Sequence, residues 1–124
     1  MYEVTIKKPF SAAHVLKEIG GKCEDLHGHN FVVEVSVMAD ELNAEGILID
    51  FRILKKWTDD IIKKLDHKYL NDIECFEGIN PTSEIIAKFI YDRISKKTRR
   101  HHFDVSRVTV WESENAKVSY NGNK

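Results

Sequence analysis

The chain has 124 residues, of which 42% are hydrophobic and 31% are charged, with two prolines and a formal net charge of −1 at pH 7. The length predicts a single domain spanning residues 1–124, and the composition excludes a disordered, collagen-like or membrane-spanning protein. Because the net charge is near zero, we expect neither a nucleic acid nor a membrane as a partner.

The opening "MYEVTIKK" lacks the charged leader and apolar run of a secretory signal, so a cytoplasmic protein is expected. Two cysteines, Cys23 and Cys75, lie in different sequence contexts. A pair this sparse in a leaderless chain predicts two free thiols rather than a disulfide. Cys23 would then be available for chemistry.

Two segments alternate with the period of a strand. In residues 2–7 the apolar side chains Tyr2, Val4 and Ile6 share one face, and Pro9 is expected to close the strand. In residues 31–37 the same alternation recurs, with a phenylalanine and three valines on one face and Glu34 on the other. We predict two strands, the second of them half-buried.

The next two segments have the period of amphipathic helices. Residues 51–67 place leucine, tryptophan and isoleucine at helical spacing behind Asp50, a suitable N-cap. Residues 82–97 begin with Thr82 as a second cap and carry Glu84 in the first turn.

Residues 103–112 and 117–120 return to the strand period, which completes the order strand, strand, helix, helix, strand, strand. Strands and helices segregated in this way predict an α+β fold: a four-stranded antiparallel sheet with both helices on one face. The two exposed edges of such a sheet make self-association plausible.

The stretch "CEDLHGHNF" places a cysteine, two acidic residues and two histidines within nine residues. His27 and His29 are two residues apart, so in a strand both imidazoles project to one face, and His14 is a third candidate ligand. Three histidines suit zinc with one open coordination position. Cys23 supports two alternatives: a fourth ligand that closes a structural site, or a free thiol that acts as a base or nucleophile.

Two further groups are less specific by themselves. Asp66 and His67 lie at the end of the first predicted helix, where such polarity is common. Glu112 shares a strand face with Val108 and Val110, so it is either exposed at the strand end or a buried acceptor that needs a specific donor.

Taken together, "FSAAH", "CEDLHGHNF", "ILIDFRILK", "LDHKYLND", "NPTSE" and "VWE" resemble the 6-pyruvoyl-tetrahydropterin synthase and 6-carboxy-tetrahydropterin synthase family. The resemblance runs from about Phe10 to Glu112. It implies a tunnelling fold (T-fold) of order ββααββ, whose subunits assemble into a barrel, usually a homohexamer with active sites at subunit interfaces.

The resemblance also implies roles for individual residues. His14, His27 and His29 match the zinc ligands, and Cys23 matches the catalytic thiol. Asp66 and His67 match a proton-transferring pair supplied by a neighbouring subunit, and Glu112 matches the glutamate that anchors the pterin ring. Thr82 and Glu84 match positions that contact the pterin, although helix capping alone explains them equally well.

Three residues separate Cys23 from "HGH", which resembles the bacterial 6-carboxy-tetrahydropterin synthases. The implied activity is a zinc-dependent lyase that converts 7,8-dihydroneopterin triphosphate to 6-carboxytetrahydropterin, with release of acetaldehyde and triphosphate, on the route to queuosine and other deazapurines. Glu24, directly after Cys23, resembles instead a branch that forms 6-hydroxymethyl-dihydropterin for folate synthesis, with Glu24 as the alternative base. A non-catalytic module, stabilised by zinc with Cys23 as fourth ligand, is the remaining alternative.

Overall fold

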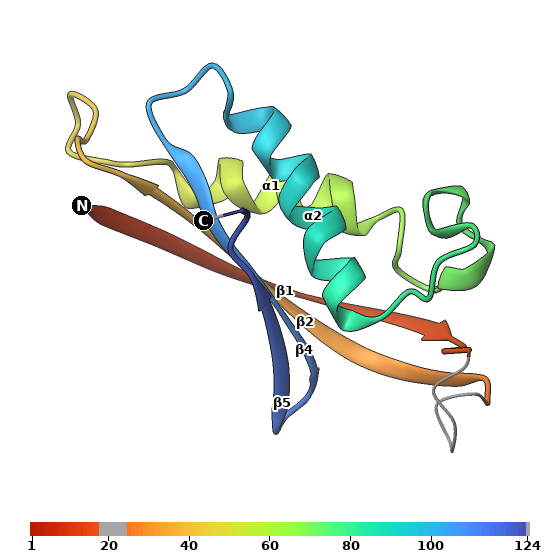
Figure 1. The fold of residues 1–124 in the computed structure, drawn as a ribbon. Coiled ribbons are helices and arrows are strands. Elements are labelled where there is room, and N and C mark those ends of the chain that lie inside the picture. The colour runs from red at the N-terminus through yellow and green to blue at the C-terminus, as the bar shows by residue number, and fades with distance from the viewer. Residues whose placement is uncertain (18–24, 124) are drawn as a thin grey trace.

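The structure is a computed structural model that describes residues 1–17 and 25–123 (Figure 1). In chain order its elements are two long strands, a helix, a short strand with two 3₁₀ turns, a second helix and two final strands. Their bounds are β1 Tyr2–His14, β2 His27–Ala39, α1 Phe51–Ile62, β3 Lys68–Tyr69, η2 Leu70–Asp72, η3 Glu74–Phe76, α2 Ser83–Thr98, β4 Asp104–Ser113 and β5 Ala116–Tyr120.

The described residues form a five-stranded mixed sheet of order β3-β1-β2-β4-β5. The four long strands pair antiparallel, as predicted. The prediction of a purely antiparallel, four-stranded sheet was wrong, because the two-residue strand β3 adds to the outer edge of β1 in parallel, pairing Lys68 with Ala12 and Tyr69 with Ala13. A strand of two residues has no period that a sequence pattern can reveal.

Strand β1 does not end at Pro9 but continues to His14. The peptide N–H and C=O of Ser11 both point away from β2, since they bond to Asp66 and His67 beyond the sheet edge. Pro9, two residues earlier, has the same orientation, so its missing N–H faces the open edge and removes no ladder bond. The strand can therefore pass through the proline.

Both helices begin at the predicted caps. The Asp50 carboxylate accepts the N–H of Arg52 at 2.8 Å, and the Thr82 hydroxyl accepts the N–H of Ile85 at 3.2 Å. Helix α1 ends at Ile62, five residues before the predicted end, and residues 63–67 continue as turns. Within the described ranges, neither helix is long and apolar enough to span a membrane.

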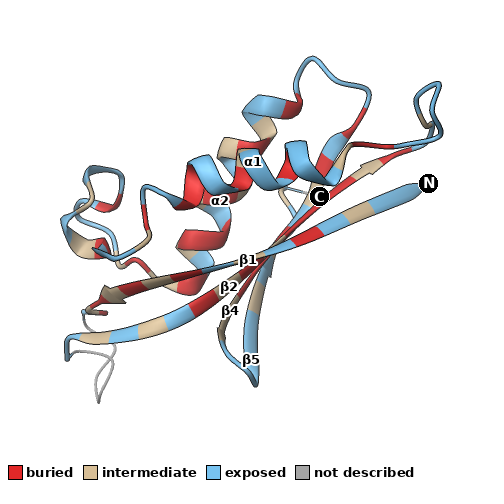
Figure 2. Cartoon of the chain, turned by 180° about the vertical axis from the view of Figure 1, so that it is seen from behind, coloured by how far each residue is buried: buried red, intermediate tan, exposed pale blue. Residues whose placement is uncertain are grey.

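Both helices cover the same face of the sheet (Figures 1 and 2). The core lies between the layers: Phe31, Val33, Val35 and Val37 of β2 are fully buried. Residues two apart in a strand share a face, so His29 and His27 continue this row towards the start of β2. The apolar pattern that buries the core therefore also directs the two histidines to the covered side.

Candidate metal centre

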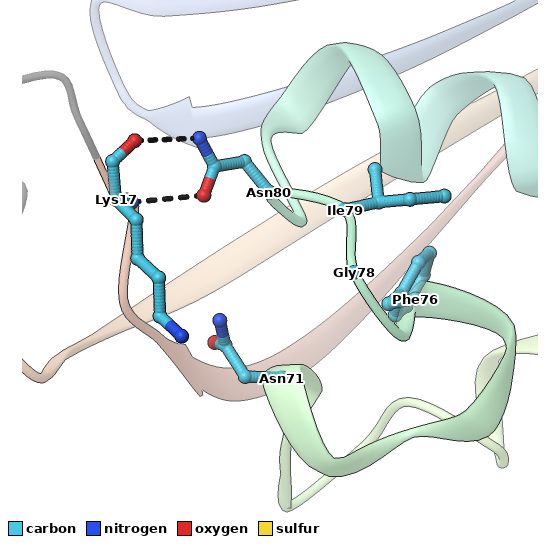
Figure 3. A pocket seen from close by; sticks show the side chains of 6 residues that line it. All are labelled: Lys17, Asn71, Phe76, Gly78, Ile79 and Asn80. Atoms are coloured by element: carbon cyan, nitrogen blue, oxygen red, sulfur yellow. Dashed lines mark hydrogen bonds between the residues drawn. The ribbon is translucent and has the colours of Figure 1, made fainter.

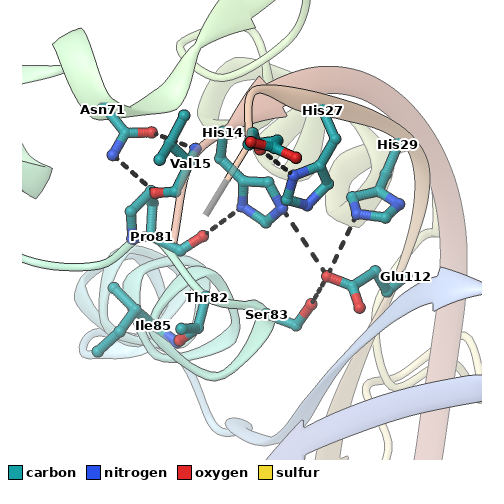
Figure 4. A network of polar contacts seen from close by, with 11 residues as sticks. His14, Val15, His27, His29, Asn71, Pro81, Thr82, Ser83, Ile85 and Glu112 are labelled. Atoms are coloured by element: carbon teal, nitrogen blue, oxygen red, sulfur yellow. Dashed lines mark hydrogen bonds and ion pairs between the residues drawn. The ribbon is translucent and has the colours of Figure 1, made fainter. Parts of the chain in front are cut away.

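Three imidazoles meet at the end of β1 and the start of β2. His14 pairs in register with His27, and Ala12 pairs with His29, so the side chains of His14, His27 and His29 share the helix-covered face. Their ring centroids are 4.5–5.3 Å apart, and one nitrogen from each ring lies within 4.8 Å of the other two (Figure 4). The strand pairing thus brings together the histidines predicted from sequence.

Backbone carbonyls orient two of the rings. Nδ1 of His14 lies 2.8 Å from the carbonyl oxygen of Pro81, and Nδ1 of His27 lies 2.7 Å from that of Asp25. A carbonyl can only accept, so each Nδ1 carries the proton and each Nε2 keeps its lone pair. Metal-binding histidines commonly have this arrangement.

His14 provides the test of whether the site suits a cation. Its side chain is fully buried, and Nε2 has no hydrogen-bond partner among the described residues. A buried acceptor without a partner is unfavourable unless a ligand satisfies it. The lone pair of Nε2 faces the other two imidazoles, so one divalent cation bound by nitrogen ligands would satisfy it.

Burial also favours the neutral, ligating form of these side chains. It lowers the pKa of His14, a shift that the carbonyl of Pro81 opposes and that the nearby His27 and His29 rings reinforce. Burial lowers the pKa of His29 as well, partly offset by the Glu112 carboxylate. Both imidazoles are therefore neutral at pH 7.

We expect the metal-free protein to lose stability as the pH falls below about 6.5, the ordinary histidine pKa. Because the folded-state pKa of His14 and His29 is lowered, the unfolded chain binds more protons below that pH, and the free energy of unfolding decreases. Urea denaturation in chelator between pH 7.5 and 5 measures this loss.

The variant His14→Gln should show a shallower decrease over the same range, whereas a variant of exposed His102, His102→Gln, should retain the wild-type slope. An unchanged slope in His14→Gln would show that this imidazole does not resist protonation in the fold.

Glu112 faces the histidine cluster from β4. Its Oε1 lies 3.6 Å from Nε2 of His29 and 4.0 Å from Nε2 of His14, and the Ser83 hydroxyl donates to the same oxygen at 3.2 Å. The carboxylate is 37% exposed, so it is neither fully buried nor simply solvated. It can accept a further donor that approaches from solvent.

A cavity of about 330 Å³ lies beside this carboxylate, and Thr82, Glu84 and Glu112 all contribute to its lining. Thr82 also caps α2, so the helix-capping interpretation holds for that residue whatever the cavity binds. The three residues predicted to contact a ligand are thus brought to one place.

Asp66 and His67 form a contact pair in the turns between α1 and β3. Oδ1 of Asp66 lies 3.1 Å from Nδ1 of His67 and also accepts the N–H of Ser11 at 2.9 Å, which holds the pKa of the carboxyl below its ordinary value. His67 has φ 59°, in the left-handed region that non-glycine residues rarely adopt. Its imidazole is 82% exposed and free to contact another molecule.

Within the described residues, Asp66 and His67 make no hydrogen bond or ion pair with the three histidines. His67 lines an open depression of about 480 Å³ together with Ser11, Ala13 and Asn30, and Ala12 and His29 also contribute to its lining. The side chains of Ser11, Ala13 and Asn30 belong to the uncovered face, because these positions alternate with Ala12, His14 and His29. His29 nevertheless borders the same depression as His67. Cys23 and Glu24 lie outside the described residues.

Sequence reasoning did not identify several groups that support the site. Ser83 bonds to Glu112, and the carbonyl of Pro81 orients His14. Both lie inside the "NPTSE" stretch, beside residues that were singled out. A backbone carbonyl leaves no trace in residue identity, so Pro81 could be found only from the fold.

The fold and the histidine cluster define an α+β protein with a candidate metal centre at one end of its sheet. Residues 3–123 match the family described as 6-pyruvoyl tetrahydropterin synthase. The chain belongs to this family, which confirms the family indicated by its motifs.

Two relatives illustrate the range of names in the family. The chain is 38% identical over 98 residues to a 6-carboxy-5,6,7,8-tetrahydropterin synthase of Bacillus subtilis, covering 75% of this chain and 65% of the relative. It therefore spans slightly less than two thirds of that protein. It is also 38% identical over 109 residues to a dihydroneopterin monophosphate aldolase of Pyrococcus furiosus, covering 88% of each chain.

A solved structure shows the same fold. The 6-pyruvoyl tetrahydropterin synthase of Caenorhabditis elegans superposes with a TM-score of 0.83 at 28% sequence identity, over 99% of this chain and 98% of the other. The two-layer arrangement described above is thus shared with that protein.

Proposed function

We propose that this protein is a zinc-dependent 6-carboxy-5,6,7,8-tetrahydropterin synthase, which converts 7,8-dihydroneopterin triphosphate to 6-carboxytetrahydropterin and releases acetaldehyde and triphosphate. The observation that carries the proposal is the buried Nε2 of His14, which has no hydrogen-bond partner within residues 1–17 and 25–123 and faces His27, His29 and the Glu112 carboxylate. A metal centre and an acceptor for a ligand ring are thereby adjacent.

His14, His27 and His29 would hold the zinc ion. When bound, the ion acts as a Lewis acid that acidifies the side-chain hydroxyls of the substrate and the neighbouring C–H bonds. Three protein ligands leave a position for the substrate, as in catalytic rather than structural zinc sites. Family membership and the relative in B. subtilis support this assignment.

Glu112 would anchor the pterin. The ring presents adjacent N–H donors, and a carboxylate can accept two of them side by side in short, charge-assisted hydrogen bonds. Ser83 already holds one oxygen of the carboxylate, which fixes its direction before the ligand arrives. Thr82 and Glu84, on the same cavity, would contact the rest of the ring.

Cys23 and His67 would move protons on opposite sides of the substrate side chain, with Asp66 orienting the His67 ring. Because the His67 imidazole is exposed and the Asp66–His67 pair makes no hydrogen bond or ion pair with His14, His27 or His29 in the described residues, we propose that it serves the histidine cluster of a neighbouring copy. The part of β1 that precedes its pairing with β3, and the outer edge of β5, would allow copies to pair. The proposed assembly is the tunnelling-fold homohexamer.

Incubating the zinc-loaded protein with 7,8-dihydroneopterin triphosphate and identifying the pterin by mass spectrometry tests the proposal. We expect 6-carboxytetrahydropterin, acetaldehyde and triphosphate, all absent after chelation. Recovery of unchanged substrate with zinc bound would refute the catalytic assignment.

A second candidate has its own support. Glu24 directly follows Cys23, and the relative from P. furiosus is named an aldolase of dihydroneopterin monophosphate. The alternative product is 6-hydroxymethyl-dihydropterin, with Glu24 as the base. Dihydroneopterin monophosphate supplied in parallel with the triphosphate distinguishes the two substrates.

The Glu24→Ala variant should keep carboxy-forming activity and lose any hydroxymethyl product. A glutamate and a thiolate differ in reach and basicity, so removing one base should remove one product. The two products are quantified by mass spectrometry at equal protein concentration. If Glu24→Ala gave the wild-type product mixture, Glu24 would not be a base for either reaction.

A further inference from the structure

Two asparagine side chains, Asn71 in "LDHKYLND" and Asn80 in "NPTSE", hydrogen-bond to the backbone just after His14. The Asn71 side chain accepts the N–H of Val15 and donates to the Val15 carbonyl, both at 2.9 Å (Figure 4). The Asn80 side chain makes the same pair of bonds with Lys17, both at 2.8 Å (Figure 3). Nothing in the proposed reaction uses these four bonds.

The two asparagine side chains take the place of peptide partners where the strand pairing ends. β3 pairs with Ala12 and Ala13 on the outer edge of β1 and then ends. The chain leaves the strand after His14, and Lys17 lies in a turn. The N–H and C=O of Val15 and Lys17 bond instead to the side chains of Asn71, just after β3, and Asn80, just before α2. A carboxamide has one acceptor and one donor, as a peptide group does, and can replace a peptide partner.

The same segment also contacts the candidate ligand His14. Asn80 precedes Pro81, whose carbonyl accepts from Nδ1 of His14. Residues 14, 15 and 17 are therefore held to residues 71–81 at three successive points. The first of these points fixes the imidazole ring, and the other two fix the backbone that carries it.

We propose that Asn71 and Asn80 are positioning residues of the metal centre, which place His14 so that its Nε2 meets His27 and His29. The inference rests on the proposed function only in that the cluster binds zinc. Outer contacts that orient a ligating histidine typically change metal affinity by about 10- to 100-fold.

Aspartate substitutions test this without changing side-chain volume. Asn71→Asp and Asn80→Asp each keep the acceptor, lose the donor and place a carboxylate oxygen against a backbone carbonyl. Asn43→Asp is the matched control: Asn43 also bonds to the backbone, but Oδ1 only accepts, from the N–H groups of Glu45 and Ile47 at 3.0 Å. Asn43→Asp adds the same negative charge, but the new carboxylate can still accept both backbone N–H bonds.

Zinc affinity is measured by competition with a chromogenic chelator, and stability by urea denaturation in chelator. Asn71→Asp and Asn80→Asp should each weaken zinc binding about 10- to 100-fold, and Asn43→Asp should stay within about twofold. An added negative charge near the site attracts a cation, so charge alone would change affinity in the opposite direction.

Wild-type zinc affinity in both Asn71→Asp and Asn80→Asp, with only a loss of stability, would overturn the inference and leave the metal centre intact. Failure of the wild-type protein to bind zinc, or equal binding by His14→Ala, would instead overturn the metal centre and the inference with it. The two failures are thus distinguishable.

Hydrogen exchange in the wild-type protein gives a check that needs no variant. The amides of Val15 and Lys17 lie beyond β1, yet they should exchange as slowly as amides within the sheet. Exchange at the rate of an open chain would show that the asparagines do not hold this segment, and would refute the proposal.

Discussion

His14→Ala is expected to weaken zinc binding by more than about 100-fold and to abolish turnover, because it removes a ligand, whereas loss of outer contacts alone costs about 10- to 100-fold. His14 is also the most buried of the three candidate ligands. Equilibrium competition with a chelator measures the affinity, and zinc titration followed by the product assay measures turnover.

The control is His102→Ala, since His102 is exposed and lies outside the cluster. It should bind zinc as the wild type does. Because His14 is fully buried, His14→Ala will also lower stability, so its folding is checked by denaturation before affinity is compared. A folded His14→Ala protein with wild-type zinc affinity would exclude the three-histidine centre.

Glu112→Gln is expected to reduce kcat/KM by about 100-fold while leaving zinc bound. The carboxylate offers two acceptors to adjacent N–H donors of the pterin, whereas an amide offers one acceptor and sets an N–H donor against the other. Losing a hydrogen bond to a charged group and opposing a donor with a donor costs about 3 kcal/mol, or two orders of magnitude in rate.

Glu34→Gln is the matched control. Glu34 lies on neighbouring strand β2, on the opposite face from Val33 and Val35, and accepts the indole N–H of Trp111 at 2.5 Å. It should retain wild-type turnover. The kinetics and chelator competition are measured on the same preparations. If Glu112→Gln lost zinc as severely as His14→Ala, its carboxylate would act on the metal rather than on the pterin.

The parts of the fold that were predicted correctly depend on neighbours within a few residues. Alternation revealed β2, helical spacing revealed α1 and α2, and the caps Asp50 and Thr82 are local hydrogen bonds. The placement of His27 and His29 on one face follows from the same period as the buried valines. Side-chain type and spacing were sufficient for each of these.

The early end of α1, the extension of β1 through Pro9 and the parallel strand β3 were not predicted. Each depends on what the backbone meets across space. Pro9 is tolerated because its edge is open, and β3 exists because the turns after α1 return the chain to β1. A local pattern does not record which peptide groups find partners far along the chain.

By itself, the sequence determined the order of the long strands and helices, the family and the residue types of the candidate site, since these follow from periodicity and motif. Only the tertiary structure decided that Glu112 approaches the histidines, that Asp66 bonds to Ser11 at the edge of β1, and that two asparagine side chains hold the backbone just after β1. The physical reason is that all three depend on contacts between segments 55 to 83 residues apart.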